Sequence, residues 1–338
     1  MPKIGRRTFG RFAVATTAAF AIRPSRADAA AEFVFKFGNN VPETYPLNVR
    51  VTQAAERIRT ATDGRFDLQI FPAGQLGTDT DMLSQVRSGA IDCYTASGLV
   101  LSTLVPLTAI NALGFAFRDY GQVWPAMDGK LGALIRMKID AAGLHAIENI
   151  FDIGFREVSS STHPITDPAS FSGFKIRIPP SALGVSMFRA LGAAPATLNF
   201  AEAYTALQTH VVDGQENPLS IIDTAKFFEV QKFVSMTNHM WDGYWLLCNG
   251  RSWRSLPDDI RVVVSRELNR AALEDRADIA VLDASLKGKL ESKGMVFNTP
   301  DPEPFRAILK RDGFYDQWRK TFGDEAWDVM ESYTGRLT

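Results

Sequence analysis

The chain has 338 residues, of which 46% are hydrophobic and 22% charged, and its formal net charge is −1. This near-neutral balance argues against a nucleic-acid-binding protein, which needs clustered lysine and arginine. The chain is longer than one hydrophobic core usually serves, so we expect two domains.

The first residues have the pattern of an export signal. A basic start precedes a mildly apolar run at 12–22, which is too short to span a bilayer, and Ala27-Asp28-Ala29 offers a cleavage site. The pair Arg6-Arg7 resembles a twin-arginine signal, although an ordinary secretory signal with two chance arginines would look alike. We expect a signal peptide at 1–29 and a periplasmic mature protein. Without the six basic residues and one acid of that segment, the net charge is −6.

Strand and helix patterns alternate after the signal. Alternating apolar residues predict strands at 33–38, 65–71 and 90–96. Helical spacing predicts a helix over 47–58, stopped by Gly64, and a second over 81–87, closed by Gly89. This alternation predicts a mostly parallel α/β sheet.

The same alternation continues in the second half. We expect strands at 144–151, 174–179, 194–199 and 211–214, and a helix at 182–191. Asn199 and Glu202 have the spacing of a capping box, which predicts another helix start. Residues 256–294 form a nearly unbroken helical pattern with Pro257 near its start, long enough to lie across two domains.

Sequence motifs of common enzymes are absent. There is no Gly-rich phosphate loop, no G-x-S-x-G and no H-E-x-x-H, and the four histidines lack metal-ligand spacing: His145, His163, His210 and His239. We therefore expect no enzyme, metal site or cofactor, while a spatially assembled triad would not be visible here. Cys93 and Cys248 lie in apolar strand-like runs. They are either buried thiols or a disulfide, because their spacing does not decide.

Three polar residues are candidates for binding an anion. In "VVDGQENPLS", Pro218 fits the first turn of a helix, so Asn217 lies at or next to the N-cap, where free N–H groups suit an anion. Arg177 ends the strand pattern of "GFKIRIPPS", and Arg156 follows an apolar strand in "FDIGFREVSS". Strand ends line the ligand crevice of open α/β sheets, and arginine binds carboxylates bidentately. Simple capping and solvated arginines are the alternatives.

Longer stretches resemble one family. "LGAAPATLNFAEAYTALQTHVVDGQENPL" and "KFFEVQKFVSMTNHMWDGYWLLCN" resemble the solute-binding subunit of tripartite ATP-independent periplasmic (TRAP) transporters of the dicarboxylate-binding type, as do "FPAGQLGTDTDML", "VRSGAID" and "GFKIRIP". The resemblance covers essentially the whole mature chain. It implies an α/β, two-domain periplasmic-binding-protein clamshell with mixed β-sheets and a long helix spanning both domains. Domain I would comprise 30–153 and 243–282, and domain II 154–242 and 283–338.

The resemblance also implies roles for single residues. Arg177 matches the arginine that salt-bridges the ligand carboxylate, Arg156 a second arginine and Asn217 an amide on that carboxylate. Phe200 matches a residue that packs on the ligand body, and Asn40 lies on the cleft edge of the first domain. The expected function is the capture of a small organic acid by a monomer and its delivery to membrane permease subunits. A ligand sensor for a membrane receptor and a periplasmic enzyme are the alternatives.

The chain departs from the sialic-acid-binding branch of this family. Thr78 replaces an acidic residue, Ser97 a glutamate, and Val100 stands at a nearby arginine position. Charged side chains that would bind the hydroxyl groups of a polyhydroxylated sugar are therefore missing. Three aromatic residues, Trp241, Tyr244 and Trp245, cluster nearby, and we expect Trp241 or Tyr244 to face the cleft. These features predict an organic acid with an apolar, aromatic or lightly hydroxylated body.

Overall fold

The computed structural model describes residue 2 and residues 30–337, so the predicted export signal at 1–29 lies outside the described residues apart from Pro2. Contacts group Ala31–Thr338 into one compact unit. Its strands are β1 (Phe33–Gly38), β2 (Phe66–Phe71), β3 (Cys93–Ser97), β4 (Leu144–Ala146), β5 (Phe151–Ser160), β6 (Lys175–Ile178), β7 (Ala194–Thr197), β8 (Gly214–Asn217), β9 (Phe233–Asn249) and β10 (Val296–Asn298).

The helices alternate with these strands. The α-helices are α1 (Pro46–Ala61), α2 (Asp79–Ser88), α3 (Gly98–Leu101), α4 (Tyr120–Met127), α5 (Lys130–Ala141), α6 (Ala182–Ala190), α7 (Phe200–Gln208), α8 (Leu219–Thr224), α9 (Gly250–Ser255), α10 (Asp258–Ser292), α11 (Glu303–Arg311), α12 (Phe314–Phe322) and α13 (Asp324–Thr334). Short 3₁₀ helices lie at Pro106–Ala112, Pro168–Phe171 and Phe227–Glu229. Within residues 30–337, no helix combines the length and hydropathy needed to cross a membrane.

The strands of the described chain form one mixed sheet in the order β2-β1-β3-β9-β5-β8-β6-β7, with β4 and β10 paired to β9. The outer strands pair in parallel, whereas β9 runs antiparallel to β3, β4 and β5. The mostly parallel sheet predicted from alternation is thus wrong in this respect. The 17-residue strand β9 lies in the middle of this order and pairs with β3 on one side and β5 on the other, so it joins the two halves into one sheet.

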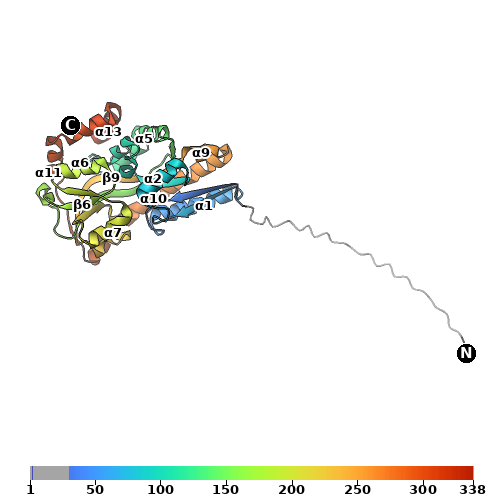
Figure 1. Ribbon diagram of the computed structural model, residues 1–338, viewed down its shortest axis with the longest axis horizontal. Helices are drawn as coiled ribbons and strands as arrows, with labels where there is room; N and C mark the ends of the chain where they lie inside the picture. The colour runs from blue at the N-terminus through green and yellow to red at the C-terminus, as the bar shows by residue number, and fades with distance from the viewer. Residues whose placement is uncertain (1, 3–29, 338) are drawn as a thin grey trace. The chain divides into compact units, whose positions relative to one another are not determined.

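Helices cover the sheet on two faces and create two hydrophobic cores. Successive residues of β9 alternate between these cores: Trp245 and Leu247 belong to one, and Leu246 and Cys248 to the other. The alternation follows from the period of two along a strand. Figure 1 shows α5, α6 and α13 on one side of β9 and α1, α7 and α10 on the other, and these helices contribute to the first and second core, respectively.

Several local predictions from sequence are confirmed. Gly89 ends α2 in the left-handed conformation, as predicted, and Thr78 forms a capping box with Asp81 that was not predicted. Asn199 and Glu202 form the predicted capping box of α7. The helix predicted over 256–294 is α10, with Pro257 as its N-cap residue.

Two strand predictions need correction. The pattern at 144–151 is split into β4 and the start of β5, separated by 147–150. The strand predicted at 211–214 lies further along, as β8 at Gly214–Asn217. Its residues Gln215 and Glu216 are polar but buried. Gln215 bonds to Ser159 and Asn217, and Glu216 bonds to Arg156, pairings that a hydrophobicity pattern does not register.

Candidate ligand-binding site

Three adjacent strands bring the predicted polar residues together. Strand β8 lies between β5 and β6, with Asn217 opposite Glu157 of β5 and Gln215 opposite Arg177 of β6. Arg156 of β5 donates from Nη2 to Asn217 Oδ1 over 3.1 Å. The residues that the sequence placed at three separate strand ends therefore form one group in the sheet.

Arg156 is fully engaged by the protein itself. It is buried and donates to both oxygens of the Glu216 carboxylate, from Nε to Oε2 and, over 2.9 Å, from Nη2 to Oε1. Its Nη1 lies 3.3 Å from Asp242 Oδ2. Burial opposes the charge, but the neighbouring carboxylates outweigh it and raise the pKa of Arg156. The guanidinium is held as part of a buried ion-pair network.

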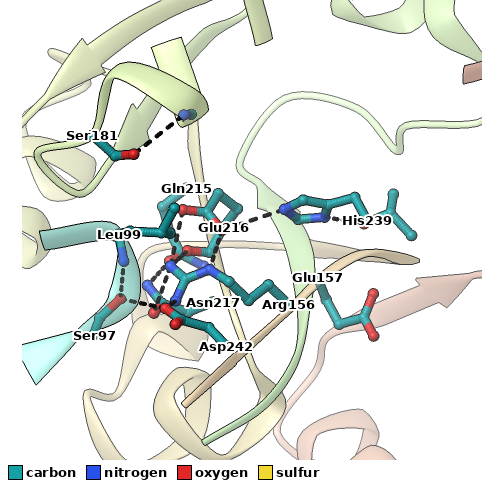
Figure 2. Close-up of polar contacts among 12 residues, drawn as sticks. Ser97, Leu99, Arg156, Glu157, Ser181, Gln215, Glu216, Asn217, His239 and Asp242 are labelled. Carbon is teal, nitrogen blue, oxygen red and sulfur yellow. Dashed lines mark hydrogen bonds and ion pairs between the residues drawn. The ribbon is translucent and has the colours of Figure 1, made fainter. Parts of the chain in front are cut away.

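The network extends on both sides of Arg156 (Figure 2). Ser97 Oγ donates to Asp242 Oδ2, and His239 Nε2 lies 3.3 Å from Glu216 Oε2. Burial favours the neutral imidazole and lowers the pKa of His239. Burial is also the largest influence on Glu216, but Arg156 and His239 overcome it and lower the pKa of that carboxyl. Burial prevails at Asp242 and raises its pKa.

Arg177 is buried without an anionic partner. Its side chain is 1% exposed, and Nε and Nη2 both donate to the backbone oxygen of Leu198, over 3.0 and 2.7 Å. No carboxylate of residues 30–337 lies within ion-pair distance. Burial lowers the pKa of Arg177 to about 10. Its Cζ lies 6.0 Å from the centre of the Phe200 ring. Burying a cation without an opposite charge carries a large free-energy penalty. An anion that binds beside Arg177 would therefore be stabilised by it.

A second polar group includes Asn40 and Tyr244. Tyr244 donates from its hydroxyl to Asn40 Oδ1 over 3.1 Å, and Asn40 donates from Nδ2 to Asp79 Oδ1 over 2.6 Å. Asp79 also accepts from the Tyr94 hydroxyl and from the backbone N–H of Phe200, over 3.2 and 3.0 Å. This group therefore reaches Phe200, whose ring lies beside Arg177, and Asp79 acts electrostatically on Arg177.

The structure does not bring Trp241 into this group. Trp241 is fully buried, donates from Nε1 to Asp152 Oδ1 over 3.0 Å and packs edge-on against Trp124. Trp245 is buried in the same core. Asn217 does not cap α8, since its Nδ2 donates to Gln215 and Pro218 is the N-cap residue of that six-residue helix. The alternative that Asn217 simply caps this helix is therefore wrong, whereas its predicted place next to the N-cap is confirmed. Asn217 also lies beside Arg156.

Comparison with known proteins places the chain in a family. The family model for bacterial extracellular solute-binding proteins, family 7 (DctP), matches residues 37–320. The chain belongs to this family. Its members are solute-binding proteins, not enzymes.

Individual TRAP solute-binding proteins are similar over nearly their whole length. The C4-dicarboxylate-binding periplasmic protein of Rhodobacter capsulatus is 33% identical over 268 residues, covering 78% of each chain. A TRAP solute-binding protein from Sulfurospirillum deleyianum with bound succinate is 30% identical, with a TM-score of 0.84 over 90% of this chain and 99% of that one. Another, from Roseobacter denitrificans with bound L-galactonate, is 31% identical, with a TM-score of 0.83 over 90% and 99%. The chain thus has the α/β periplasmic-binding-protein fold of TRAP solute-binding proteins. The long helix α10 contacts α1 and β5 from the first half of the chain, and α8 and β10 from the second half.

Several residues of this site are not among those predicted from the sequence. Asp242 is a charged residue inside the apolar run "MWDGYWLL", which is a usable signal for a buried functional group. Asp79 resembles an ordinary acidic residue in the first turn of α2, yet it is buried. Among residues 30–337, no group of three or more His, Cys, Asp or Glu side chains could hold a metal ion.

Proposed function

We propose that this TRAP solute-binding protein captures a small carboxylate, with Arg177 as the residue that neutralises it. The observation that supports this is the contrast between two buried arginines on neighbouring strands. Arg156 is paired with Glu216 and Asp242, whereas Arg177 has only the Leu198 carbonyl. Asn217 lies beside Arg156 and can donate to the same carboxylate once its bond to Gln215 is given up.

The body of the ligand is hydroxylated in this proposal. The groups beside Arg177 and Phe200 are rich in acceptors: Asp79 and Asn40 offer oxygens that a ligand hydroxyl can donate to. A second carboxylate there would meet the charge of Asp79, so a dicarboxylate is disfavoured. Trp241, which would have favoured an aromatic ligand, packs in the core. A sugar-derived monocarboxylic acid of the L-galactonate kind therefore fits better than succinate. This proposal replaces the apolar, aromatic or lightly hydroxylated body expected from the sequence, because buried Asp79 supplies acceptor oxygens that the sequence did not reveal.

A thermal-shift screen followed by titration calorimetry tests this proposal. Aldonates should raise the melting temperature more than C4-dicarboxylates do, since only native protein binds them. With the best acid, Arg177→Ala should lose about 30-fold to several-thousand-fold in affinity, because truncating one partner of a desolvated charge pair costs roughly 2–5 kcal/mol. Arg177→Lys should recover part of this, since lysine restores the charge without the fork.

Arg311→Ala is the matched control. Arg311 is 70% exposed and pairs only with neighbouring Asp312 in the described chain, so its loss should leave affinity unchanged. If folded Arg177→Ala binds within about threefold of wild type, Arg177 does not hold the carboxylate. A screen led by dicarboxylates would instead contradict only the hydroxylated body.

The protein acts as a monomer that closes around its ligand and delivers it to the membrane permease subunits. Domain I would comprise 30–153 and 243–282, and domain II 154–242 and 283–338. Irregular pairing of β5 with β9 near Asp152 and Gly154, where Gly154 has a φ of 111°, supports a crossing at that point. A bend there disturbs little regular hydrogen bonding.

Export of this periplasmic protein uses the twin-arginine route in our proposal. The Arg6-Arg7 pair before the apolar run supports it. The Arg6→Lys, Arg7→Lys double variant should accumulate in the cytoplasm, as cell fractionation would reveal. Normal periplasmic levels of that variant would reject this route and favour the general secretory one.

A further inference from the structure

The two cysteines of the chain face each other across two strands. Cys93 of β3 lies directly opposite Cys248 of β9 in the antiparallel ladder. The backbone N–H of Asn249 donates to the carbonyl of Asp92 over 2.8 Å, so the bonds flank the cysteine pair instead of joining it. In such non-hydrogen-bonded pairs the Cα atoms are about 4.5 Å apart and the side chains come closest. That separation lies within the roughly 4.4–6.8 Å range of disulfides.

The side chains of Cys93 and Cys248 point toward each other. The two Sγ atoms are 2.8 Å apart, and both residues belong to the core that also contains Leu246. Cys93 is 2% exposed and Cys248 is fully buried. The sequence holds no third cysteine that could compete. The fold therefore brings together, without any backbone movement, two sulfurs that are 155 residues apart in the chain.

We propose that Cys93 and Cys248 form a cross-strand disulfide in the mature protein. The inference rests on periplasmic localisation, by either export route, and not on the identity of the ligand. Secreted proteins meet an oxidising compartment in which disulfides form and persist. The two thiols give up two protons and two electrons to the disulfide of a thiol oxidant. The Sγ–Sγ bond forms as the oxidant's sulfur–sulfur bond breaks to two thiols.

Burial decides when this exchange occurs. Burial raises the pKa of the Cys93 thiol, with a smaller effect from Cys248, so the Cys93 thiolate is scarce in the folded protein. Both sulfurs also lie in buried residues, where an oxidant does not reach them. Oxidation must therefore precede closure of the core or use a local opening of β3 from β9. The finished bond is shielded in the same way. It braces the ladder in which Ser97 pairs with Tyr244, two residues of the candidate site.

Differential alkylation of protein taken from the periplasm tests the proposal. Acid-quenched, denatured wild type is treated with a maleimide carrying a polyethylene glycol chain, with or without prior reduction. We expect no labelling before reduction and labelling of both cysteines after it. Labelling of both cysteines before reduction would overturn the disulfide.

Two single variants provide matched controls. Cys93→Ala and Cys248→Ala each leave one cysteine, which should be labelled without reduction and so shows that the reagent reaches it. If neither variant accumulates, the intact mass of wild type decides alone. A gain of two hydrogens on reduction supports the bond, and an unchanged mass rejects it.

Discussion

Two arginines that look alike in sequence have different surroundings in the structure. Arg156 and Arg177 both follow apolar strand patterns, and both are buried. Glu216 and Asp242 neutralise Arg156, while Arg177 meets only a carbonyl. Arg156 is thus neutralised within the protein, and in our proposal Arg177 is available for the charge of the ligand.

This difference predicts that substitutions of the two arginines change the free energy of unfolding by unequal amounts. Arg156→Ala should lower the free energy of unfolding by about 3–5 kcal/mol, because it leaves the buried carboxylates of Glu216 and Asp242 without their cation. Arg177→Ala should change it by less than about 1 kcal/mol, since the lost contacts are offset by relief of an uncompensated buried charge. Chemical denaturation of both variants without ligand measures this. Equal destabilisation would contradict the assignment of the two roles.

At the scale of elements, β5 and α10 bury carboxyl groups against each other. Asp152 accepts from Trp241, and its backbone N–H donates to Asp275 Oδ2 over 3.0 Å. Asp283 lies further along α10, close to Gly154, and its Oδ1 has no hydrogen-bond partner. Burial raises the pKa of Asp152 to about 6 and that of Asp283 to about 7. Burial also raises the pKa of Glu157, which lies on β5 with Asp152, to about 8.

These shifts predict that stability falls as pH rises. A carboxyl whose folded-state pKa is raised binds more protons folded than unfolded between its two pKa values, so its stabilising contribution is present near pH 4 and is lost as pH passes about 6–8. Denaturant unfolding should therefore give a larger free energy at pH 5 than at pH 8. Asp283→Asn should flatten this profile and be about 1–3 kcal/mol more stable than wild type at pH 8. A profile unchanged by Asp283→Asn would contradict this account.

At the scale of the molecule, a few polar contacts join segments that the domain proposal assigns to different halves. Phe200 N–H donates to Asp79 Oδ2, and the Thr80 hydroxyl lies 3.4 Å from Asn199 Oδ1. The Tyr45 and Ser220 hydroxyls, which the same proposal assigns to different halves, are 3.1 Å apart. These contacts would break if the halves separated, so under the domain proposal they belong to the closed form.

Ligand binding should therefore compact the protein. Binding shifts an open–closed equilibrium by as much as the ligand prefers the closed form. X-ray scattering of wild type should show a smaller radius of gyration with a saturating acid than without it. Arg177→Ala at the same acid concentration is the control and should stay expanded. Identical radii for wild type with and without ligand would argue against closure.

The sequence by itself determined the elements with strong local signals. The capping box at Asn199, the left-handed Gly89 and the apolar periodicity of α10 are local, so short stretches predicted them correctly. The family resemblance likewise rested on contiguous strings such as "DGQENP". Both kinds of signal depend on neighbours in the chain.

Only the tertiary structure decided which polar residues meet. The Arg156–Glu216 pair joins residues 60 positions apart, Asp242 reaches Ser97 across 145, and Cys93 reaches Cys248 across 155. Strand periodicity gives a side chain's face but not which strand lies beside it. Whether a buried arginine is neutralised or available for a ligand depends on that neighbour, because charge in a poorly solvated interior is governed by the nearest opposite charge.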